Sequence, residues 1–291
     1  MLLVPFVFLI AFMRHDYRWV LPRTTIQLGK RTAIMGILNV TPDSFSDGGD
    51  YFDFDRAIAR GREMEQEGAD IIDIGGESSR PGSEAVPEEE EIRRVVPVIE
   101  GVAKAVTIPV SVDTYHSRVA QRALEAGAQA VNDISAFRFD DHMPAVVKEN
   151  RAGVVLMHSR GTRDTLHLQP RMTDAIAEVG DSLSLAAQKG VAAGIPSESI
   201  VIDPGIGFGK AAEESIVILK SLGVFSKIRY PVLVGTSRKS FIRLITSDIQ
   251  EARGSGTAAT VVVAIMNGAH VVRVHDVRQT RVLADVTDRL V

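Results

Sequence analysis

The sequence predicts one (β/α)8 barrel, a TIM barrel, preceded by an N-terminal hairpin or cap segment. Apolar runs rich in Val and Ile alternate with amphipathic stretches eight times along the chain, which is typical of a parallel sheet. The runs have few polar side chains before their last residues, as strands covered on both faces should. No linker or shift in composition interrupts the series, so we expect a single barrel domain. A doubly wound open sheet is the alternative architecture.

The elements can be placed in order along the chain. A hairpin or capping segment is expected over residues 19–30, and the strands then span 32–40, 69–75, 109–114, 130–134, 153–158, 200–204, 231–235 and 271–276. Asp53 and Asp55 are the expected caps of the first helix. Pro87 opens the second helix, and Asp141 begins the fourth. Later helices are predicted to end near residue 194, to cover residues 256–267 and to reach the C-terminus.

The N-terminal residues 1–17 are predicted to be an apolar tail outside the barrel domain, which covers residues 18–291. Met1 to Met13 form an apolar run that is too short to span a membrane comfortably. It has neither a preceding basic residue nor a small-residue cleavage site, so it is a poor signal peptide. We interpret it as a packing tail or as the result of an upstream translation start, and a membrane-surface anchor is the alternative.

Composition excludes several classes of function. The net charge is −4 with both signs interspersed, whereas a nucleic-acid surface needs a clustered basic patch. The chain has no cysteine, which excludes disulfides, thiolate nucleophiles and zinc held by cysteine. No HExxH motif or hydrolase-type Ser-His-Asp order occurs. A cytoplasmic enzyme that acts on small molecules fits these observations.

Polar residues close the predicted strands, and in such barrels the active site lies at the carboxyl ends of the strands. One group of them is acidic or carries an amide: Asp73, Asp113, Asn132 and Asp203. Carboxylates accept N–H donors and Asn offers both donor and acceptor, so the group suits a flat, nitrogen-rich heterocycle. Ion pairing with a barrel Lys or Arg is the alternative, but few basic residues lie inside the strands. Asp133 should point the other way and be a satisfied helix cap or a solvated loop charge.

The last strand carries Arg273 and His275, which a period of two places on one face. Arg presents a fork to phosphate oxygens and His can donate another bond. Asn39 ends the neighbouring first strand. Its carbonyl could hold a divalent ion, because Mg²⁺ takes few protein ligands together with substrate phosphates.

The seventh strand leads into Ser237, Arg238 and Lys239. Lys239 could act as a point charge on a ring oxygen or nitrogen, whereas Arg238 is expected to be structural and turned toward an acidic helix. The stretch from Asp203 to Lys210 is glycine-rich without the spacing of a phosphate or dinucleotide fingerprint. Its glycines would let backbone and Phe208 approach a ligand closely.

These segments together resemble the dihydropteroate synthase family. The matching motifs, in order, are the stretch Met35 to Gly49 with Asn39-Val-Thr-Pro-Asp, the stretch Asp73 to Gly82 with Glu77-Ser-Ser-Arg-Pro, Ser111-Val-Asp-Thr, Asn132-Asp-Ile, Asp203-Pro-Gly-Ile-Gly-Phe-Gly-Lys, Gly235-Thr-Ser-Arg-Lys-Ser and Arg273-Val-His-Asp. The resemblance covers the chain from about residue 32 to its C-terminus.

The resemblance implies a folate-biosynthesis transferase that joins hydroxymethyl-dihydropterin pyrophosphate to para-aminobenzoate, with Mg²⁺ as cofactor. It implies that the pterin is held by Asp113, Asn132, Asp203 and Lys239, with Met157 and Phe208 packing near it. Asp73 and Gly235 are further candidate substrate-binding residues. The pyrophosphate would be held by Asn39, Arg273 and His275. Asn39 would also bind the Mg²⁺ ion. Phe45, Ser79, Arg80, Pro81 and Ser237 would shape the aminobenzoate site. Asp47, Lys239, Arg273 and His275 would act at the reacting centre.

Two departures and two alternatives accompany the resemblance. Ser79 stands where the family usually has Thr, and the loop from His158 to Thr162 differs from the common form. The alternatives are a pterin-binding methyltransferase and a non-catalytic pterin carrier. Members of the family are commonly homodimers, and the helix over residues 256–267 is the expected contact surface.

Overall fold

The structure is a computed structural model in which residues 14–40, 50–78, 83, 85–166, 168–246 and 248–291 are described. The apolar tail Met1 to Met13 lies outside the described residues, so the predictions about it stay predictions. Within the described part of the chain, no helix is both long and apolar enough to cross a membrane.

Eight of the described strands form one sheet, in the order β8-β7-β6-β5-β4-β3-β10-β9, in which neighbouring strands pair in parallel. The strands are β3 (Ala33–Asn39), β4 (Ile71–Gly75), β5 (Val110–Asp113), β6 (Ala130–Asp133), β7 (Gly153–Met157), β8 (Ile200–Asp203), β9 (Leu233–Val234) and β10 (Val271–Val274). A parallel bridge between Ile202 and Val232 joins the two ends of this sheet. The (β/α)8 barrel is therefore confirmed, and the open-sheet alternative is wrong.

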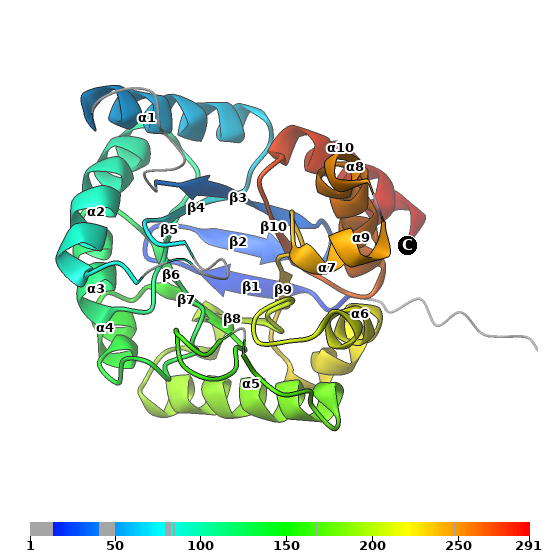
Figure 1. Ribbon diagram of the computed structural model, residues 1–291. Coiled ribbons are helices and arrows are strands. Elements are labelled where there is room, and N and C mark those ends of the chain that lie inside the picture. Colours follow the sequence, from blue (N-terminus) through cyan, green and yellow to red (C-terminus); the bar gives the residue numbers. More distant parts are fainter. Residues whose placement is uncertain (1–13, 41–49, 79–82, 84, 167, 247) are drawn as a thin grey trace, which may run out of the picture.

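The helices ring the barrel, as Figure 1 shows. They are α1 (Asp50–Gln66), α2 (Glu88–Ala105), α3 (Ser117–Glu125), α4 (Met143–Glu149), α5 (Ala175–Ala192), α6 (Ala212–Lys220), α7 (Ser240–Ile245), α8 (Ile249–Arg253), α9 (Ser255–Met266) and α10 (Val277–Leu290), with 3-10 turns η2 (Ser197–Ser199) and η3 (Leu222–Ile228).

Two predicted helix starts were wrong. Helix α1 already begins at Asp50, so Asp53 and Asp55 lie within the helix and do not cap it. Helix α4 begins at Met143 with Pro at its start, two residues after the predicted Asp141. Proline needs no partner for a backbone N–H, which suits the first turn of a helix.

Strand alternation divides the core into two layers. The outward residues, such as Ile34, Ile72 and Val112, pack against the helices in the main apolar cluster. The inward residues, such as Met35 and Val155, fill the barrel interior in a separate cluster. A period of two therefore assigns each strand residue to one layer, and it also decides which polar residues face the barrel axis.

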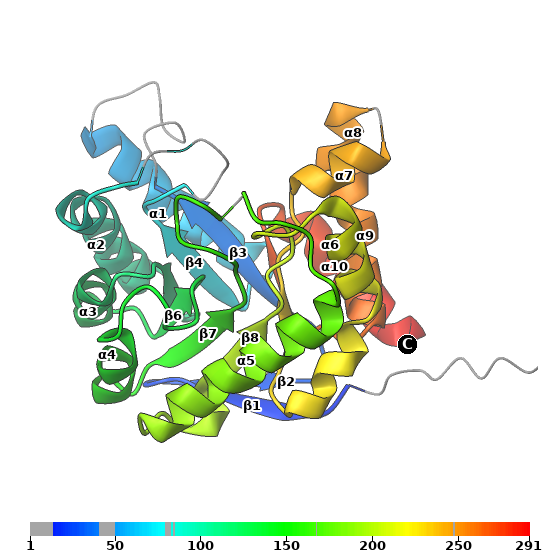
Figure 2. The same cartoon turned by 60° about the horizontal axis from the view of Figure 1, so that its bottom comes forward.

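An antiparallel hairpin of β1 (Tyr17–Val20) and β2 (Thr25–Leu28) precedes the barrel, as predicted. Its Trp19 is fully buried, and the indole Nε1 donates to the carbonyl of Ser199 at 3.1 Å, directly before β8. Figure 2 shows the hairpin lying across the base of the barrel. The base is thus closed, which leaves the carboxyl ends of the strands for a ligand.

Candidate functional site

Alternation places six polar side chains on the inward faces of the strands, one step beyond the apolar filling of the barrel. They are Asp73, Ser111, Asp113, Asn132, Asp203 and Arg273. We call this group the polar layer. Most of its members are buried, so each must find partners within the barrel or on a ligand.

Asp73 is the centre of the polar layer. Its Oδ1 accepts a hydrogen bond from Ser111 Oγ at 2.6 Å, and its Oδ2 accepts from Asn132 Nδ2 at 2.9 Å. Arg273 Nε donates to the same Oδ2 at 2.6 Å, while Arg273 Nη2 donates to Asp113 Oδ2 at 2.6 Å. Arg273 therefore bridges two carboxylates from neighbouring strands, and both of its bonds are charge-assisted.

This bridge corrects one step of the sequence argument. We expected the strand carboxylates to lack a basic partner, yet Arg273 pairs with Asp73 and Asp113. The residues are far apart in sequence, but β10 lies beside β3 and β3 beside β4, so Arg273 can reach across. Burial alone would lower the pKa of the Arg273 guanidinium, but the two carboxylates, Asp73 and Asp113, outweigh it and raise this pKa. Arg273 is thus permanently charged inside the barrel.

Asn132 has one polar atom that the described part of the chain does not satisfy. Its Nδ2 binds Asp73, whereas its buried Oδ1 has no hydrogen-bond partner there. A buried acceptor without a partner costs about 1–3 kcal/mol. The atom is therefore ready to accept an N–H donor from a ligand.

Asp203 and Lys239 place opposite charges on the other side of the barrel mouth. Burial raises the pKa of Asp203 to about 6, although Oδ1 accepts from the Gly205 amide at 2.7 Å. Burial and the nearby Arg273 lower the pKa of Lys239 to about 8, while Asp203 opposes the shift. The Lys239 ammonium lies 3.7 Å from the ring centroid of Phe208, within range of a cation–π contact.

Apolar side chains form a small separate cluster beside the polar layer, where Met157 is in register with Asp203. It consists of Ile134, Met157, Leu166 and Phe208, with Tyr115 packed against it. Met157 and Phe208 were both predicted as substrate contacts, and the structure brings them together. A flat ring held at its edge by carboxylates and amides would find apolar contact here.

The remaining predicted residues lie around the same mouth. Ser237 Oγ is 3.0 Å from His275 Nδ1, so the residue expected for aminobenzoate adjoins one expected for pyrophosphate. Arg238 pairs with Asp276 directly before α10, which agrees with a structural role. Asn39 ends β3 half-buried on the inward face, and Gly235 directly follows β9.

Asp133 serves the fold instead of the site. It is fully buried outside the polar layer, and its carboxylate accepts from the amides of Ser135 and Phe137 at 2.8 and 2.7 Å. Asp133 points away from the polar layer, as predicted, but it satisfies the amides of a buried turn and is neither a helix cap nor a solvated loop charge. Five predicted residues, Phe45, Asp47, Ser79, Arg80 and Pro81, lie outside the described residues.

Comparison with known proteins identifies the family. The family described as pterin binding enzyme matches residues 35–275. The dihydropteroate synthase of Bacillus subtilis is 45% identical over 261 residues, which cover 90% of this chain and 89% of the relative. That of Clostridium beijerinckii is 46% identical over 265 residues, covering 91% of this chain and 96% of the relative. The chain belongs to the dihydropteroate synthase family.

Solved structures of the dihydropteroate synthase family have the same fold. One from Clostridium difficile, with pteroic acid, has a TM-score of 0.85 at 43% identity and covers 90% of this chain and 98% of its own. One from Xanthomonas albilineans, with 4-aminobenzoic acid, has a TM-score of 0.87 at 39% identity and covers 95% and 98%. The resemblance in sequence thus extends to the whole barrel.

Sequence reasoning missed two members of this dihydropteroate synthase site. Ser111 lies in a motif that we quoted, but only its bond to Asp73 shows why a hydroxyl stands there. Its position two residues before Asp113 was the available signal, since both must face inward. Lys210 is the second missed residue. Its side chain turns back into the barrel mouth, and no sequence pattern predicts that direction.

Proposed function

We propose that the chain is a dihydropteroate synthase. In the reaction, the bond between the pterin CH2 group and pyrophosphate breaks, a bond from that carbon to the amine of para-aminobenzoate forms, and the amine releases a proton. The observation that carries the proposal is the polar layer with its unsatisfied Asn132 Oδ1, in a chain 45% identical to such an enzyme. The methyltransferase and carrier alternatives have no observation of their own in their favour.

The polar layer suits the pterin ring in the orientation that its donors require. A pterin presents an amino group and ring N–H groups along one edge, and carboxylates and the Asn132 carbonyl accept from them. Asp73 is already satisfied by Ser111, Asn132 and Arg273, so it holds the other groups in place. We assign direct contacts with the ring to Asp113, Asn132 and Asp203.

The cations of the site suit a leaving pyrophosphate. Arg273 uses Nε and Nη2 for the two carboxylates, and within the described part of the chain Nη1 has no hydrogen bond. We assign Nη1 to the pyrophosphate, with His275 beside it on the same inward face. Preorganised charges aimed at a developing anion lower the barrier most when they are fixed beforehand, as Arg273 is.

We propose Mg²⁺ as the cofactor, with Asn39 as its protein ligand. The Asn39 side chain has no hydrogen bond to another described residue and stands on the inward face beside β10. One amide oxygen together with substrate phosphates fits the way that proteins hold Mg²⁺. The bound ion would neutralise charge on the departing pyrophosphate.

Within the described part of the chain, we assign the contact with para-aminobenzoate to Ser237, since its hydroxyl adjoins His275 at the barrel mouth. Phe45, Ser79, Arg80 and Pro81 complete this subsite in our proposal, and Asp47 acts near the reacting carbon. No strong general base is required if the C–O bond breaks before the weakly basic amine attacks.

We further propose a homodimer in the cytoplasm. Exposed apolar side chains lie on neighbouring helices: Met266 on α9 is 50% exposed, and Val282 and Val286 on α10 are 62% and 54% exposed. Apolar side chains gathered on a surface favour association. Sedimentation equilibrium tests the dimer, and a monomer at micromolar concentration would contradict it.

A titration tests the pterin site. Asn132→Ala removes the unsatisfied acceptor and its bond to Asp73, so pterin affinity should fall about tenfold or more. The control is Asn267→Ala directly after α9, whose side-chain amide, among the described residues, donates to the Val263 carbonyl alone. Isothermal titration with a phosphate-free pterin should show the loss in the first variant alone. Equal affinity in both variants would contradict the assignment.

A further inference from the structure

We propose that Lys210 is a positioning residue that holds the loop after β8 in the shape the pterin site needs. It acts through three backbone carbonyls and has no contact with the substrate. The inference rests on the proposed function for its substrate, since it concerns which of the two substrates loses affinity when Lys210 is changed.

The Lys210 ammonium donates all of its hydrogen bonds in the described part of the chain to backbone carbonyls. Its Nζ donates to the carbonyls of His158 at 3.0 Å, Gly205 at 2.8 Å and Phe208 at 3.1 Å. An ammonium has three N–H donors and no acceptor, so each donor has one carbonyl. The three carbonyls come from two segments, the end of β7 and the loop after β8. Lys210 thus joins these segments at one point.

The loop after β8 is folded so that its carbonyls can converge. Gly205, Gly207 and Gly209 have φ values of 65°, 79° and 66°, in the left-handed region that favours glycine. A side chain at Gly205 would place its Cβ 2.0 Å from the His158 carbonyl oxygen. The loop therefore packs directly on the carbonyl that Lys210 binds, and converging carbonyl dipoles need a cation between them.

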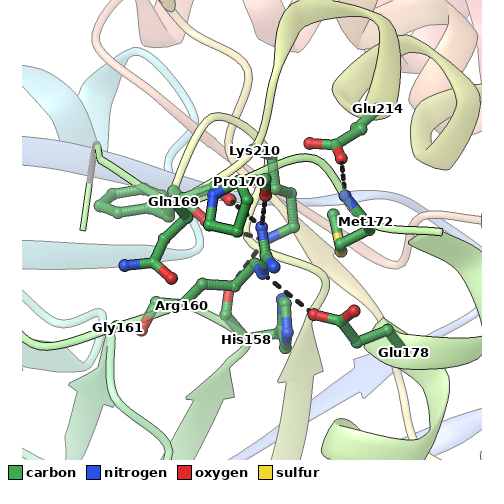
Figure 3. Close-up of polar contacts among 12 residues, drawn as sticks. His158, Arg160, Gly161, Gln169, Pro170, Met172, Glu178, Lys210 and Glu214 are labelled. Atoms are coloured by element: carbon green, nitrogen blue, oxygen red, sulfur yellow. Dashed lines mark hydrogen bonds and ion pairs between the residues drawn. The ribbon is translucent and has the colours of Figure 1, made fainter. Parts of the chain in front are cut away.

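Arg160 secures the outer end of the same loop. Its Nη1 donates to the carbonyls of Pro170 and, at 3.4 Å, Gly209, and its Nε lies 3.0 Å from Glu178 of α5. Figure 3 shows Arg160 and Lys210 close together, with His158 beneath them and Glu178 on α5. Arg160 has a carboxylate partner on α5, whereas the bonds of Lys210 within the described part of the chain all go to carbonyls, with Asp203 and then Glu214 as the nearby negative charges.

The residues that Lys210 holds carry the pterin contacts. Phe208, whose carbonyl it binds, has the Lys239 ammonium over its ring at 3.7 Å. Asp203 accepts from the amide of Gly205, whose carbonyl Lys210 also binds. Loss of Lys210 would free both loop carbonyls and so shift Phe208 and the Gly205 amide. The effect should fall on the pterin side, because Ser237 and His275 belong to other strands.

Lys210→Met tests the proposal, because it keeps the apolar stem and removes all three donors. We expect the KM for pterin pyrophosphate and the Kd for a phosphate-free pterin to rise about tenfold or more, from the loss of charge-assisted bonds. The KM for para-aminobenzoate should change less than about twofold. Lys189→Met is the matched control, since Lys189 also ties a carbonyl, that of Phe137, but away from the polar layer. Equal rises of both KM values, or no rise, would overturn the proposal.

The absence of cysteine allows a chemical version of the same test. Lys210→Cys is alkylated while unfolded and then refolded. An aminoethyl group restores the ammonium, and a propyl group gives the same length without charge. Pterin affinity should return with the aminoethyl form alone. If the propyl form binds equally well, or if only the aminoethyl form folds, Lys210 does not act as proposed.

The pterin titration also separates this inference from the proposed function. If the unmodified protein binds pterin but makes no dihydropteroate, the function fails while the effect of Lys210 on pterin affinity is still measured. If turnover occurs and Lys210→Met leaves pterin affinity intact, the function stands and this inference fails.

Discussion

At the scale of single residues, Asp73 and Arg273 form the unit on which the site depends. Asp73 is fully buried and accepts three hydrogen bonds, and Arg273 bridges it to Asp113. Removing one partner of a buried ion pair costs about 3–5 kcal/mol, because the remaining charge stays buried. Arg273 therefore has a structural task in addition to its proposed bond to pyrophosphate.

Arg273→Lys should separate these two tasks. Lysine keeps the positive charge but cannot span two carboxylates with a planar fork. We expect a loss of about tenfold or more in affinity for a phosphate-free pterin, because Asp113 is no longer held. Isothermal titration measures it, with Lys239→Arg as a second charge-preserving variant. A loss confined to pyrophosphate-bearing ligands would show that the bridge does not matter for the ring.

The pKa values of the site predict an acid limb in pterin binding. Burial raises the pKa of Asp203 to about 6 and also raises that of Asp113, against the lowering by Arg273. A carboxyl group accepts N–H donors best when ionised, so affinity should fall as the pH drops from about 6.5 to 5, through the pKa of Asp203. Titration with a phosphate-free pterin at several pH values avoids the ionisation of the substrate phosphates.

Two lysines near the proposed pterin site affect pterin affinity at the alkaline end of the pH range. Burial lowers the pKa of Lys239 to about 8 and that of Lys210 to about 7, so both side chains lose their charge as the pH rises. These groups predict a second limb on the alkaline side. In Asp203→Asn the acid limb should become shallower while the alkaline limb persists. An affinity that does not change between about pH 6.5 and 5, where both lysines stay mostly charged, would contradict the role of the carboxylates.

The sequence predicted which residues meet at the site better than it predicted how they bond. Alternation correctly placed Asp73, Asp113 and Asn132 on inward faces, since a period of two is a local property of the strand. The bridge from Arg273 could not be read in the same way, because it depends on which strands are neighbours in space. Lys210 was invisible for a similar reason, as its role depends on carbonyls that converge only in the folded loop.

At the scale of elements, the loop after β8 is the least replaceable connection in the described part of the site. Gly205 combines a φ of 65° with a Cβ position only 2.0 Å from the His158 carbonyl oxygen. No rotamer relieves a contact between a Cβ and a backbone atom. The strand–loop junction therefore depends on glycine at this position.

Gly205→Ala should lower the free energy of unfolding by about 2 kcal/mol or more, from left-handed strain plus the clash. Gly207→Ala is the matched control, since its φ is 79° but its Cβ would meet only Lys239 Cδ at 3.4 Å. We expect about 1 kcal/mol for that variant from backbone strain alone. Urea unfolding followed by circular dichroism measures both. Similar losses in the two variants would mean that the contact with His158 is not limiting.

Helix boundaries show the limit of local sequence signals at this scale. Asp53 and Asp55 have the residue type of a helix cap, but α1 begins earlier, at Asp50. An acidic residue is favourable in the first turn as well as at the cap, so residue type alone could not separate the two positions. The strands were predicted within one or two residues, because burial on both faces gives a stronger pattern.

At the scale of the whole molecule, the barrel separates stability from function. The hairpin closes the base, and the polar layer lies near the opposite ends of the strands. The eightfold rhythm of the sequence predicted this division, since active sites of such barrels use the carboxyl ends of the strands. Changes at the base should therefore affect folding and leave substrate affinity alone.

Trp19→Ala tests this separation. The side chain is fully buried in the barrel interior, and replacing a buried Trp with Ala costs about 3–5 kcal/mol. Denaturant unfolding should show that loss, while the KM values of the folded variant remain within about twofold of the original. A selective rise in the KM for pterin would mean that the base and the site are coupled.

Turnover tests the central claim most directly. The purified protein is mixed with hydroxymethyl-dihydropterin pyrophosphate, para-aminobenzoate and Mg²⁺, and dihydropteroate is followed by chromatography. We predict product that disappears with EDTA and returns with added Mg²⁺, and a much lower rate in Lys239→Met. Pterin binding without any dihydropteroate would contradict the account and favour a pterin carrier or a pterin-dependent methyltransferase.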